Sequence, residues 1–180
     1  MARPGSVIWV YAGLLALGYG VARIVWPGHP KVRSGMKVLL LGDSLAQGLS
    51  LPLSAIAKEA QVEFKTMAKA GTGTADWSAN SALVQLLETY RPGLTLVSLG
   101  ITDEKMQESN LKALLALLKQ YGDVGWISPP RGVSAVVEAN VPQSHIFRTS
   151  NYDLPYGPDR LHPTIRGYAG WAAEIWKWLS

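Results

Sequence analysis

Short apolar runs alternate with amphipathic segments along most of the chain. Five runs rich in apolar residues are predicted as strands, and the first is continuous, which favours burial on both faces of a sheet. The predicted strands are residues 36–41, 62–68, 94–99, 124–128 and 145–149. The predicted helices are residues 49–60, 77–90, 104–121, 133–140 and 163–179. This alternation predicts an α/β fold in which a parallel sheet carries helices on both faces.

The helix signals differ in strength. The clearest helix is 104–121, whose leucines follow the spacing i, i+3, i+4 and i+7 at Leu111, Leu114, Leu115 and Leu118. We expect Asp76 to cap the helix over 77–90, and Pro52 to lie in the first turn of the helix over 49–60. Since ligands of such sheets bind beyond the carboxyl ends of the strands, candidate chemistry is expected directly after each strand.

The chain begins with an uncharged apolar segment over residues 7–22. Together with Ser6 and residues 23–26 it is long enough for about one bilayer crossing. We therefore predict a single-pass membrane anchor over residues 1–26, a linker over 27–35 and one domain over 36–180. Small residues spaced four apart would let two such helices approach closely, and they are Ala12, Ala16 and Gly20.

Other interpretations of this segment stay open. A cleaved signal peptide and a buried core helix are the alternatives to an anchor. The sequence favours the cell envelope, but the side of the membrane on which the domain lies is not decided, because cations near the two ends of a short segment give an uncertain count.

Composition and charge exclude several classes of protein and of functional site. Hydrophobic residues make up 48% of the 180 residues and charged residues 17%, which excludes a disordered chain. Cysteine is absent, so disulfides, thiolate metal sites and cysteine nucleophiles are excluded. The net charge of +4 comes from the N-terminal segment, because residues 34–180 carry 13 cations and 13 anions. Net charge therefore gives no reason to expect a nucleic-acid partner.

The first predicted strand is followed by Gly42, Asp43, Ser44 and Leu45. A serine at the sheet edge near a helix N-terminus can attack an electrophile, and its own backbone N–H can face the oxyanion that forms. An ordinary polar turn with a helix cap is the alternative interpretation of these four residues.

A second group of polar residues precedes the last predicted helix. Pro163 suits the first helical position, which would place His162 at the mouth of that helix. A tight turn can bring the carboxylate of Asp159 onto the imidazole, where it would stabilise the imidazolium formed when His162 takes a proton from Ser44. Taken singly, His162 also suits a helix cap and Asp159 a surface loop.

Two more strand ends carry candidate residues. Gly71 and Gly73 follow the second strand, where glycine lets backbone N–H groups approach a substrate, or simply forms a turn. Thr102 follows the third strand and can point a donor into the same cleft, or cap the next helix.

These four blocks together resemble the SGNH hydrolases, also called the GDSL esterase/lipase family. The resemblance implies a three-layer α/β/α sandwich with about five parallel strands, and hydrolysis of esters without a metal or organic cofactor. It implies that Ser44 is the nucleophile, that His162 and Asp159 complete a triad, and that Ser44, Gly71 and Thr102 form the oxyanion hole. Gly73 can take the place of Gly71 in a looser alignment. The resemblance begins near Lys37.

One position departs from the family pattern, because Thr102 stands where the family has asparagine. Removing one such donor can lower the rate roughly a hundredfold. The expected function is thus a membrane-anchored serine esterase that acts on an acylated glycan or a lipid, with O-acetyl groups of envelope glycans as one substrate. The alternative is a weakly active or inactive binding or structural protein of the same fold, in a phage or virion for example.

Overall fold

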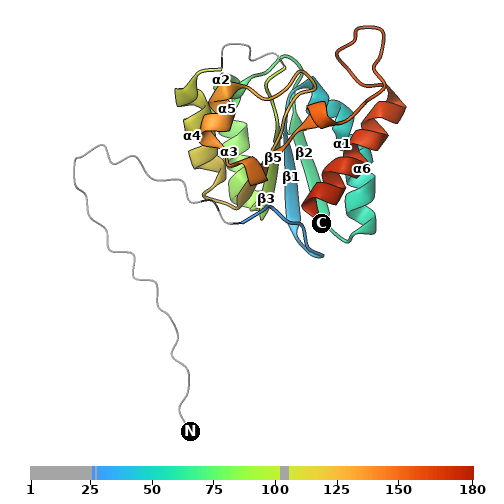
Figure 1. Cartoon of the computed structure of the whole chain (residues 1–180). Helices are drawn as coiled ribbons and strands as arrows, with labels where there is room; N and C mark the ends of the chain where they lie inside the picture. The colour runs from blue at the N-terminus through green and yellow to red at the C-terminus, as the bar shows by residue number, and fades with distance from the viewer. Residues whose placement is uncertain (1–25, 27, 102–105) are drawn as a thin grey trace, which may run out of the picture.

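A parallel sheet of five strands forms the centre of the molecule (Figure 1). The computed structural model describes residues 26, 28–101 and 106–180. The strands are β1 (Lys37–Gly42), β2 (Glu63–Ala68), β3 (Leu94–Ser98), β4 (Asp123–Ile127) and β5 (Ile146–Phe147). Their spatial order is β2-β1-β3-β4-β5, and all neighbouring pairs are parallel. The chain runs from β1 to β2 on one side and then crosses past β1 to β3 on the other, so the carboxyl ends of β1 and β3 form the topological switch point of the sheet.

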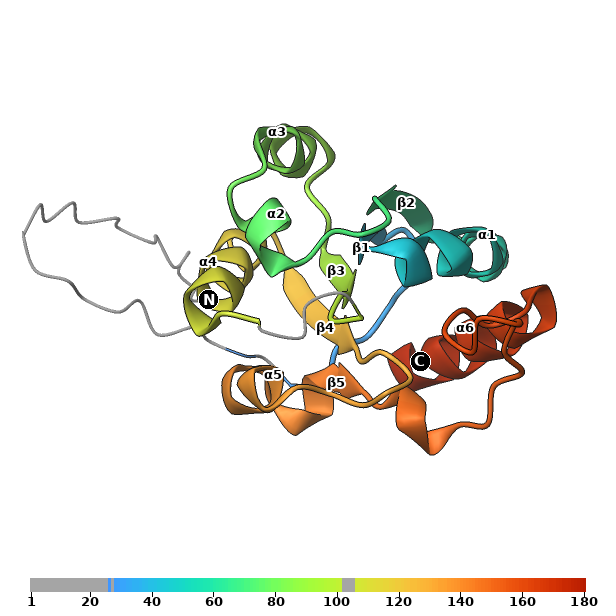
Figure 2. The same ribbon diagram turned by 90° about the horizontal axis from the view of Figure 1, so that it is seen from above.

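Helices cover both faces of this sheet, as Figure 2 shows from above. One face carries α1 (Ser44–Glu59) and α6 (Ile165–Leu179). The other carries α2 (Thr74–Ser78), α3 (Ser81–Tyr90), α4 (Glu108–Leu118) and α5 (Ala135–Asn140). Alternate residues of β1 enter the two cores, Val38 and Leu40 on the α1 side and Leu39 and Leu41 on the other. The predicted α/β class with a five-stranded parallel sheet is confirmed, and its helices make it a three-layer sandwich.

The start of the first helix was predicted wrongly. Helix α1 begins at Ser44, five residues before the expected start, and Pro52 lies inside it. The Asp43 side chain accepts the Leu45 N–H at 2.9 Å and so caps the helix directly after β1. An early cap of this kind places Ser44 in the first turn of α1, while the missing N–H of Pro52 is tolerated further along.

The helix predicted over 77–90 is two helices. Asn80 accepts the Leu83 N–H and is the cap of α3, so the prediction of Asp76 as the cap is wrong. Asp76 lies inside α2 and its carboxylate accepts the Gly73 N–H. A second capping residue in the middle of an apolar pattern therefore broke a segment that periodicity alone joins.

The last helix and the last strand also differ from the prediction. Helix α6 begins at Ile165 with Thr164 as its cap, so Pro163 is not its first residue; Pro163 instead forms an isolated antiparallel bridge with Tyr156. The fifth strand has two residues and is flanked by 3-10 turns, η1 (Gln143–His145) and η2 (Thr149–Asn151).

The predicted anchor lies outside the described residues, apart from Trp26. Within the described ranges, no helix combines the length and apolar character needed to cross a bilayer. The predicted linker is described from residue 28 and contacts the domain: the Val32 N–H donates to the Leu179 carbonyl and the Gly35 N–H to the Gln61 carbonyl.

Candidate active site

Ser44 lies at the switch point of the sheet. It is the first residue of α1, two residues beyond the end of β1, and its side chain is half-buried. Gly42 is required here by close packing, because a Cβ at this position would lie 2.1 Å from the Ser98 carbonyl oxygen of β3. The N–H of Ser44 belongs to the first turn of α1, whose amides have no partner within the helix. It is available to an anion at this end of the helix.

Asp43 supports this turn from inside the protein. Its side chain is fully buried, and its second carboxylate oxygen has no hydrogen-bond partner among the described residues. Burial raises the pKa of Asp43 from 3.8 to about 6, and the backbone N–H groups of Leu45 and Ile101 partly oppose this rise. A carboxyl group that is costly to ionise therefore lies next to Ser44.

The loop before α6 brings His162 to Ser44. The Gly157 N–H donates to the His162 carbonyl, and Arg160 adopts a left-handed conformation with φ of 55°. This turn directs the His162 ring so that Nε2 lies 2.8 Å from Ser44 Oγ, across 118 positions of sequence. The distance is that of a hydrogen bond, so proton transfer between the two groups needs no rearrangement.

Asp159 lies on the other side of the imidazole. Its Oδ2 is 2.7 Å from His162 Nδ1, while its Oδ1 accepts the backbone N–H groups of Leu161 and His162 at 3.0 Å each. The hydrogen bond with the His162 ring is the largest cause, and the two backbone N–H groups add to it. Together these contacts lower the pKa of Asp159 from 3.8 to about 2. The group is therefore an anion at neutral pH, which favours the Nδ1–H tautomer and leaves Nε2 free to accept a proton from Ser44.

The three side chains form an open site. The His162 side chain is 36% exposed and that of Asp159 is 51% exposed. A substrate can therefore reach Ser44 Oγ directly, and the arrangement can activate a hydroxyl nucleophile by general-base catalysis.

The two glycines that follow β2 differ in the state of their backbone N–H groups. Gly71 lies in an exposed turn with φ of +76°, a conformation that favours glycine. The Gly73 N–H donates to Asp76 Oδ2 at 2.8 Å, so this amide is already engaged. Of the two candidate oxyanion donors, Gly73 therefore has its N–H bound within the protein, and Gly71 stays the candidate. Thr102 lies outside the described residues.

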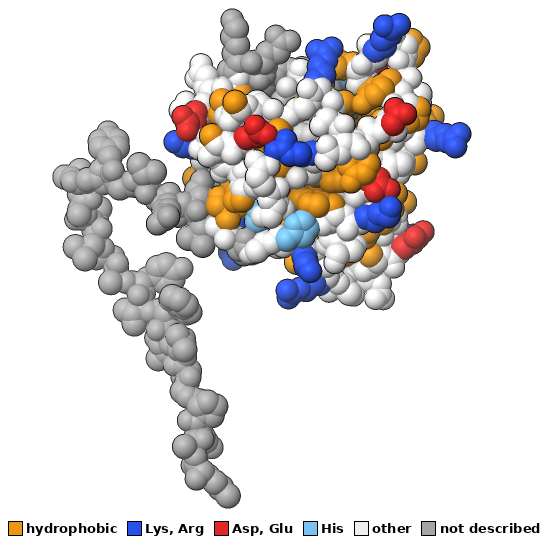
Figure 3. Space-filling model, viewed as in Figure 1, with side chains coloured by type: hydrophobic (Ala, Val, Ile, Leu, Met, Phe, Trp, Pro, Cys, Tyr) orange, Lys and Arg blue, Asp and Glu red, His pale blue; other side chains and the backbone are white. Residues whose placement is uncertain are grey.

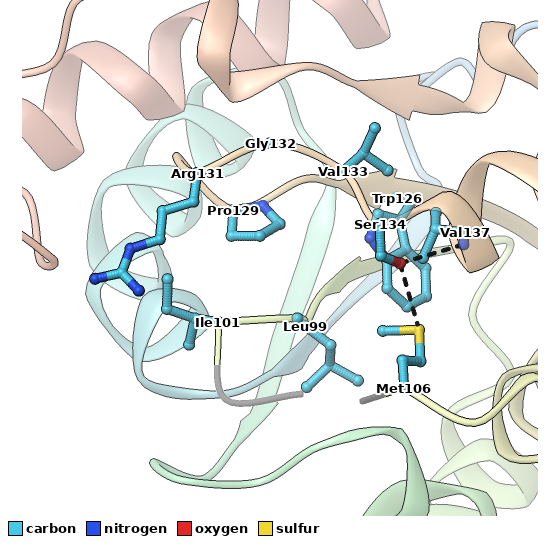
Figure 4. Close-up of a pocket in the computed structure, with 11 residues that line it drawn as sticks. Leu99, Ile101, Met106, Trp126, Pro129, Arg131, Gly132, Val133, Ser134 and Val137 are labelled. Carbon is cyan, nitrogen blue, oxygen red and sulfur yellow. Dashed lines mark hydrogen bonds between the residues drawn. The ribbon is translucent and has the colours of Figure 1, made fainter. Parts of the chain in front are cut away.

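A cavity of about 240 Å³, which no sequence motif indicates, lies beyond the carboxyl ends of β3 and β4. Figure 4 shows apolar side chains around it, with Arg131 extending toward Ile101 at one side and Ser134 at the other. The Ser134 hydroxyl accepts the Val137 N–H at 3.3 Å. The lining residues are Leu99, Gly100, Ile101, Met106, Trp126, Pro129, Arg131, Gly132, Val133, Ser134 and Val137. The cavity lies at the same edge of the sheet as Ser44, although none of the three side chains described above lines it.

Comparisons with known proteins place this fold among esterases. No protein-family model and no curated protein matches the chain. A catalytic mutant of an acetylxylan esterase from Geobacillus stearothermophilus matches with a TM-score of 0.62 at 15% identity, over 83% of this chain and 96% of that chain. The psychrotrophic esterase EstA from a Pseudoalteromonas species, inhibited by monoethylphosphonate, matches with a TM-score of 0.56 at 18% identity. The match covers 78% of this chain and 98% of that chain.

An α/β hydrolase enzyme from the metagenome of Lake Arreo in Spain has a TM-score of 0.57 at 17% identity, over 82% of this chain and 96% of that chain. At these identities the likeness concerns the fold. The chain thus has the fold of these esterases, in agreement with its resemblance to the SGNH hydrolases.

Proposed function

We propose that this chain is a serine esterase held at a membrane by its N-terminal segment. The observation that carries the proposal is the continuous contact from Ser44 Oγ to His162 Nε2, 2.8 Å, and from His162 Nδ1 to Asp159 Oδ2, 2.7 Å. Three polar side chains aligned in this order, beside a helix N-terminus, are the arrangement that makes a serine hydroxyl nucleophilic.

The reaction would proceed in two acyl-transfer steps. His162 Nε2 takes the proton of Ser44 Oγ while Oγ attacks the ester carbonyl carbon, and the ionised Asp159 stabilises the imidazolium. The N–H groups of Ser44 and Gly71, with the Thr102 hydroxyl, would hold the oxyanion. His162 then gives its proton to the alcohol oxygen as the C–O bond breaks. Water, activated by the same histidine, releases the acyl group and restores Ser44.

Two findings from the neighbours support these roles. Among the solved structures, catalytic mutants of the acetylxylan esterase replace a histidine in one case and, in another, the aspartate three positions before it. Asp159 and His162 have the same spacing. The matched Pseudoalteromonas esterase was solved with an ethylphosphonate inhibitor, a class of reagent that reacts with nucleophilic serines.

The substrate we propose is an acetyl ester of an envelope glycan. The fold is shared with an acetylxylan esterase, and the apolar segment that ends before Trp26 would hold the domain at the cell envelope as a single-pass protein. Ala12, Ala16 and Gly20 would allow two such segments to associate.

The test is covalent labelling of the full-length protein with a fluorophosphonate probe, together with turnover of p-nitrophenyl acetate. We expect both in the wild type and neither in Ser44→Ala. Ser54→Ala, an exposed serine of the same helix, is the matched control and should keep both. Failure of the wild type to label or turn over would favour the inactive binding protein instead.

A further inference from the structure

The described part of the N-terminal region is docked on the folded domain. The His29 ring nitrogens lie 2.8 Å from the Ser144 carbonyl oxygen and 2.5 Å from that of Trp178. The Trp26 ring packs edge-on against His145, with ring centroids 4.8 Å apart, and Lys119 Nζ lies 4.6 Å from the centre of the same ring. Trp26 and residues 28–36 are therefore docked on the body of the domain.

All of these contacts lie at one edge of the sheet. Lys119 is paired at 2.9 Å with Asp123, the first residue of β4, and His145 directly precedes β5. Because every strand is parallel, this is the edge at which the strands begin, and Ser44 lies at the edge at which they end. Figure 1 shows the two edges at the bottom and top of the sheet. A six-residue strand separates them by about 20 Å.

The distance from the apolar segment to this docked region is short. Residues 23–25 alone separate the uncharged run, which ends at Ala22, from Trp26. Four residues of extended chain reach at most about 14 Å. If the apolar segment crosses a bilayer, the starting edge of the sheet must therefore lie next to the bilayer surface.

We infer that the domain is oriented with the starting edge of its sheet against the membrane and with Ser44 facing away from it. This inference rests on the membrane anchor in the proposed function. It makes the substrate a water-exposed ester, on a glycan or a soluble molecule, and excludes the phospholipids of the anchoring membrane, whose ester bonds lie below their headgroups on the wrong side of the domain.

The charge of the starting edge agrees with this orientation. Exposed cations lie before β1, at its first residue, and before β3, and Figure 3 shows basic side chains along this lower edge. Exposed carboxylates near these cations are Glu59, Glu63 and Glu88, and Asp123 is paired with Lys119. The cations are Lys31, Arg33, Lys37 and Arg91. A net positive edge is attracted to anionic headgroups.

The orientation can be measured because the chain has no cysteine. Glu63→Cys and Lys69→Cys form a matched pair: both positions are exposed, Glu63 is the first residue of β2, and Lys69 directly follows its last residue. Each full-length variant is spin-labelled, reconstituted in vesicles containing a nickel-chelating lipid, and compared for relaxation enhancement of the label. We expect clearly stronger enhancement at position 63. Equal enhancement, or stronger enhancement at position 69, overturns the orientation, as does failure of the protein to float with the vesicles.

A second measurement tests the substrate class in the same vesicles. We expect hydrolysis of dissolved p-nitrophenyl acetate and no release of fatty acid from the vesicle phospholipid. Fatty-acid release that is lost in Ser44→Ala would overturn the exclusion of membrane lipids. Hydrolysis of neither ester would overturn the proposed enzyme and its substrate class, whereas the spin-label comparison would still decide the orientation.

Discussion

The carboxylate of Asp159 contacts both the backbone and the ring of His162. One carboxylate oxygen accepts the backbone N–H of His162 at 3.0 Å and the other lies 2.7 Å from Nδ1. The same group therefore shapes the turn that carries the histidine and orients the imidazole. This double contact separates two roles of one carboxylate, shaping the turn and carrying charge, because an amide can fulfil only the first.

Asp159→Asn tests the charge alone. The asparagine Oδ1 can still accept the two backbone N–H groups, so we expect the fold to be retained. The loss of the anion should lower kcat for p-nitrophenyl acetate by roughly 10³ to 10⁴-fold, since the wrong histidine tautomer is then favoured. Asp153→Asn, an exposed carboxylate in the same loop, should leave kcat unchanged. Equal rates for the two variants would remove Asp159 from the mechanism.

Gly71 and Gly35 form a matched pair for the oxyanion role. Both have φ of +76°, and in both an added Cβ would meet no atom within 4 Å. Alanine at either position should lower the free energy of unfolding by about 1 kcal/mol through backbone strain. Gly71→Ala should also lower kcat, by roughly tenfold to a hundredfold, because a small shift of its N–H misplaces the oxyanion donor. A similar change of kcat in Gly35→Ala would make the effect one of stability.

Two substitutions test the Thr102 hydroxyl as an oxyanion donor. Thr102→Val keeps the shape of the side chain and removes the donor, so we expect kcat to fall by about a hundredfold with little change in KM. Thr102→Ser should stay close to the wild type because it keeps the donor. Loss of kcat in Thr102→Ser, with retention in Thr102→Val, would indicate that the methyl group, and not the hydroxyl, matters at this position.

The layout of the fold and the meeting of Ser44 with His162 could be predicted because they depend on few physical rules. Parallel strands bring their carboxyl ends to one edge, so residues that follow different strands come together there. The Asp-x-x-His spacing is local, and a single turn is enough to join Asp159 to the imidazole. Pattern and motif therefore led to the same edge of the sheet.

Other features depend on contacts that leave no local pattern. Pro52 pointed to a later helix start, but the Asp43 cap begins α1 at Ser44. The docked residues His29 and Trp26 are held by backbone carbonyls and rings more than 90 positions away, and no periodicity in residues 27–35 marks these contacts. The cavity beside β3 and β4 arises where separate loops meet, which a sequence motif does not describe.

Asp43 gives a prediction for the pH dependence of stability. Its pKa is about 6 in the folded protein against 3.8 ordinarily, so the folded state binds this proton more tightly than the unfolded state. The resulting stabilisation is complete below pH 3.8 and is lost as the pH rises through 6. Over this interval the buried carboxyl should contribute a fall of about 3 kcal/mol in the free energy of unfolding.

Asp43→Asn should remove this contribution, because the amide does not ionise and its Oδ1 can still accept the Leu45 N–H. Denaturant unfolding of the full-length protein in detergent at pH 4 and pH 8 measures the difference. We expect the variant to lose less stability than the wild type between the two pH values, and to be the more stable of the two at pH 8. Glu88→Gln, an exposed carboxylate on α3, should follow the wild type. Parallel curves for Asp43→Asn and the wild type would mean that Asp43 is ionised throughout this range, stabilised by the backbone N–H groups at the start of α1.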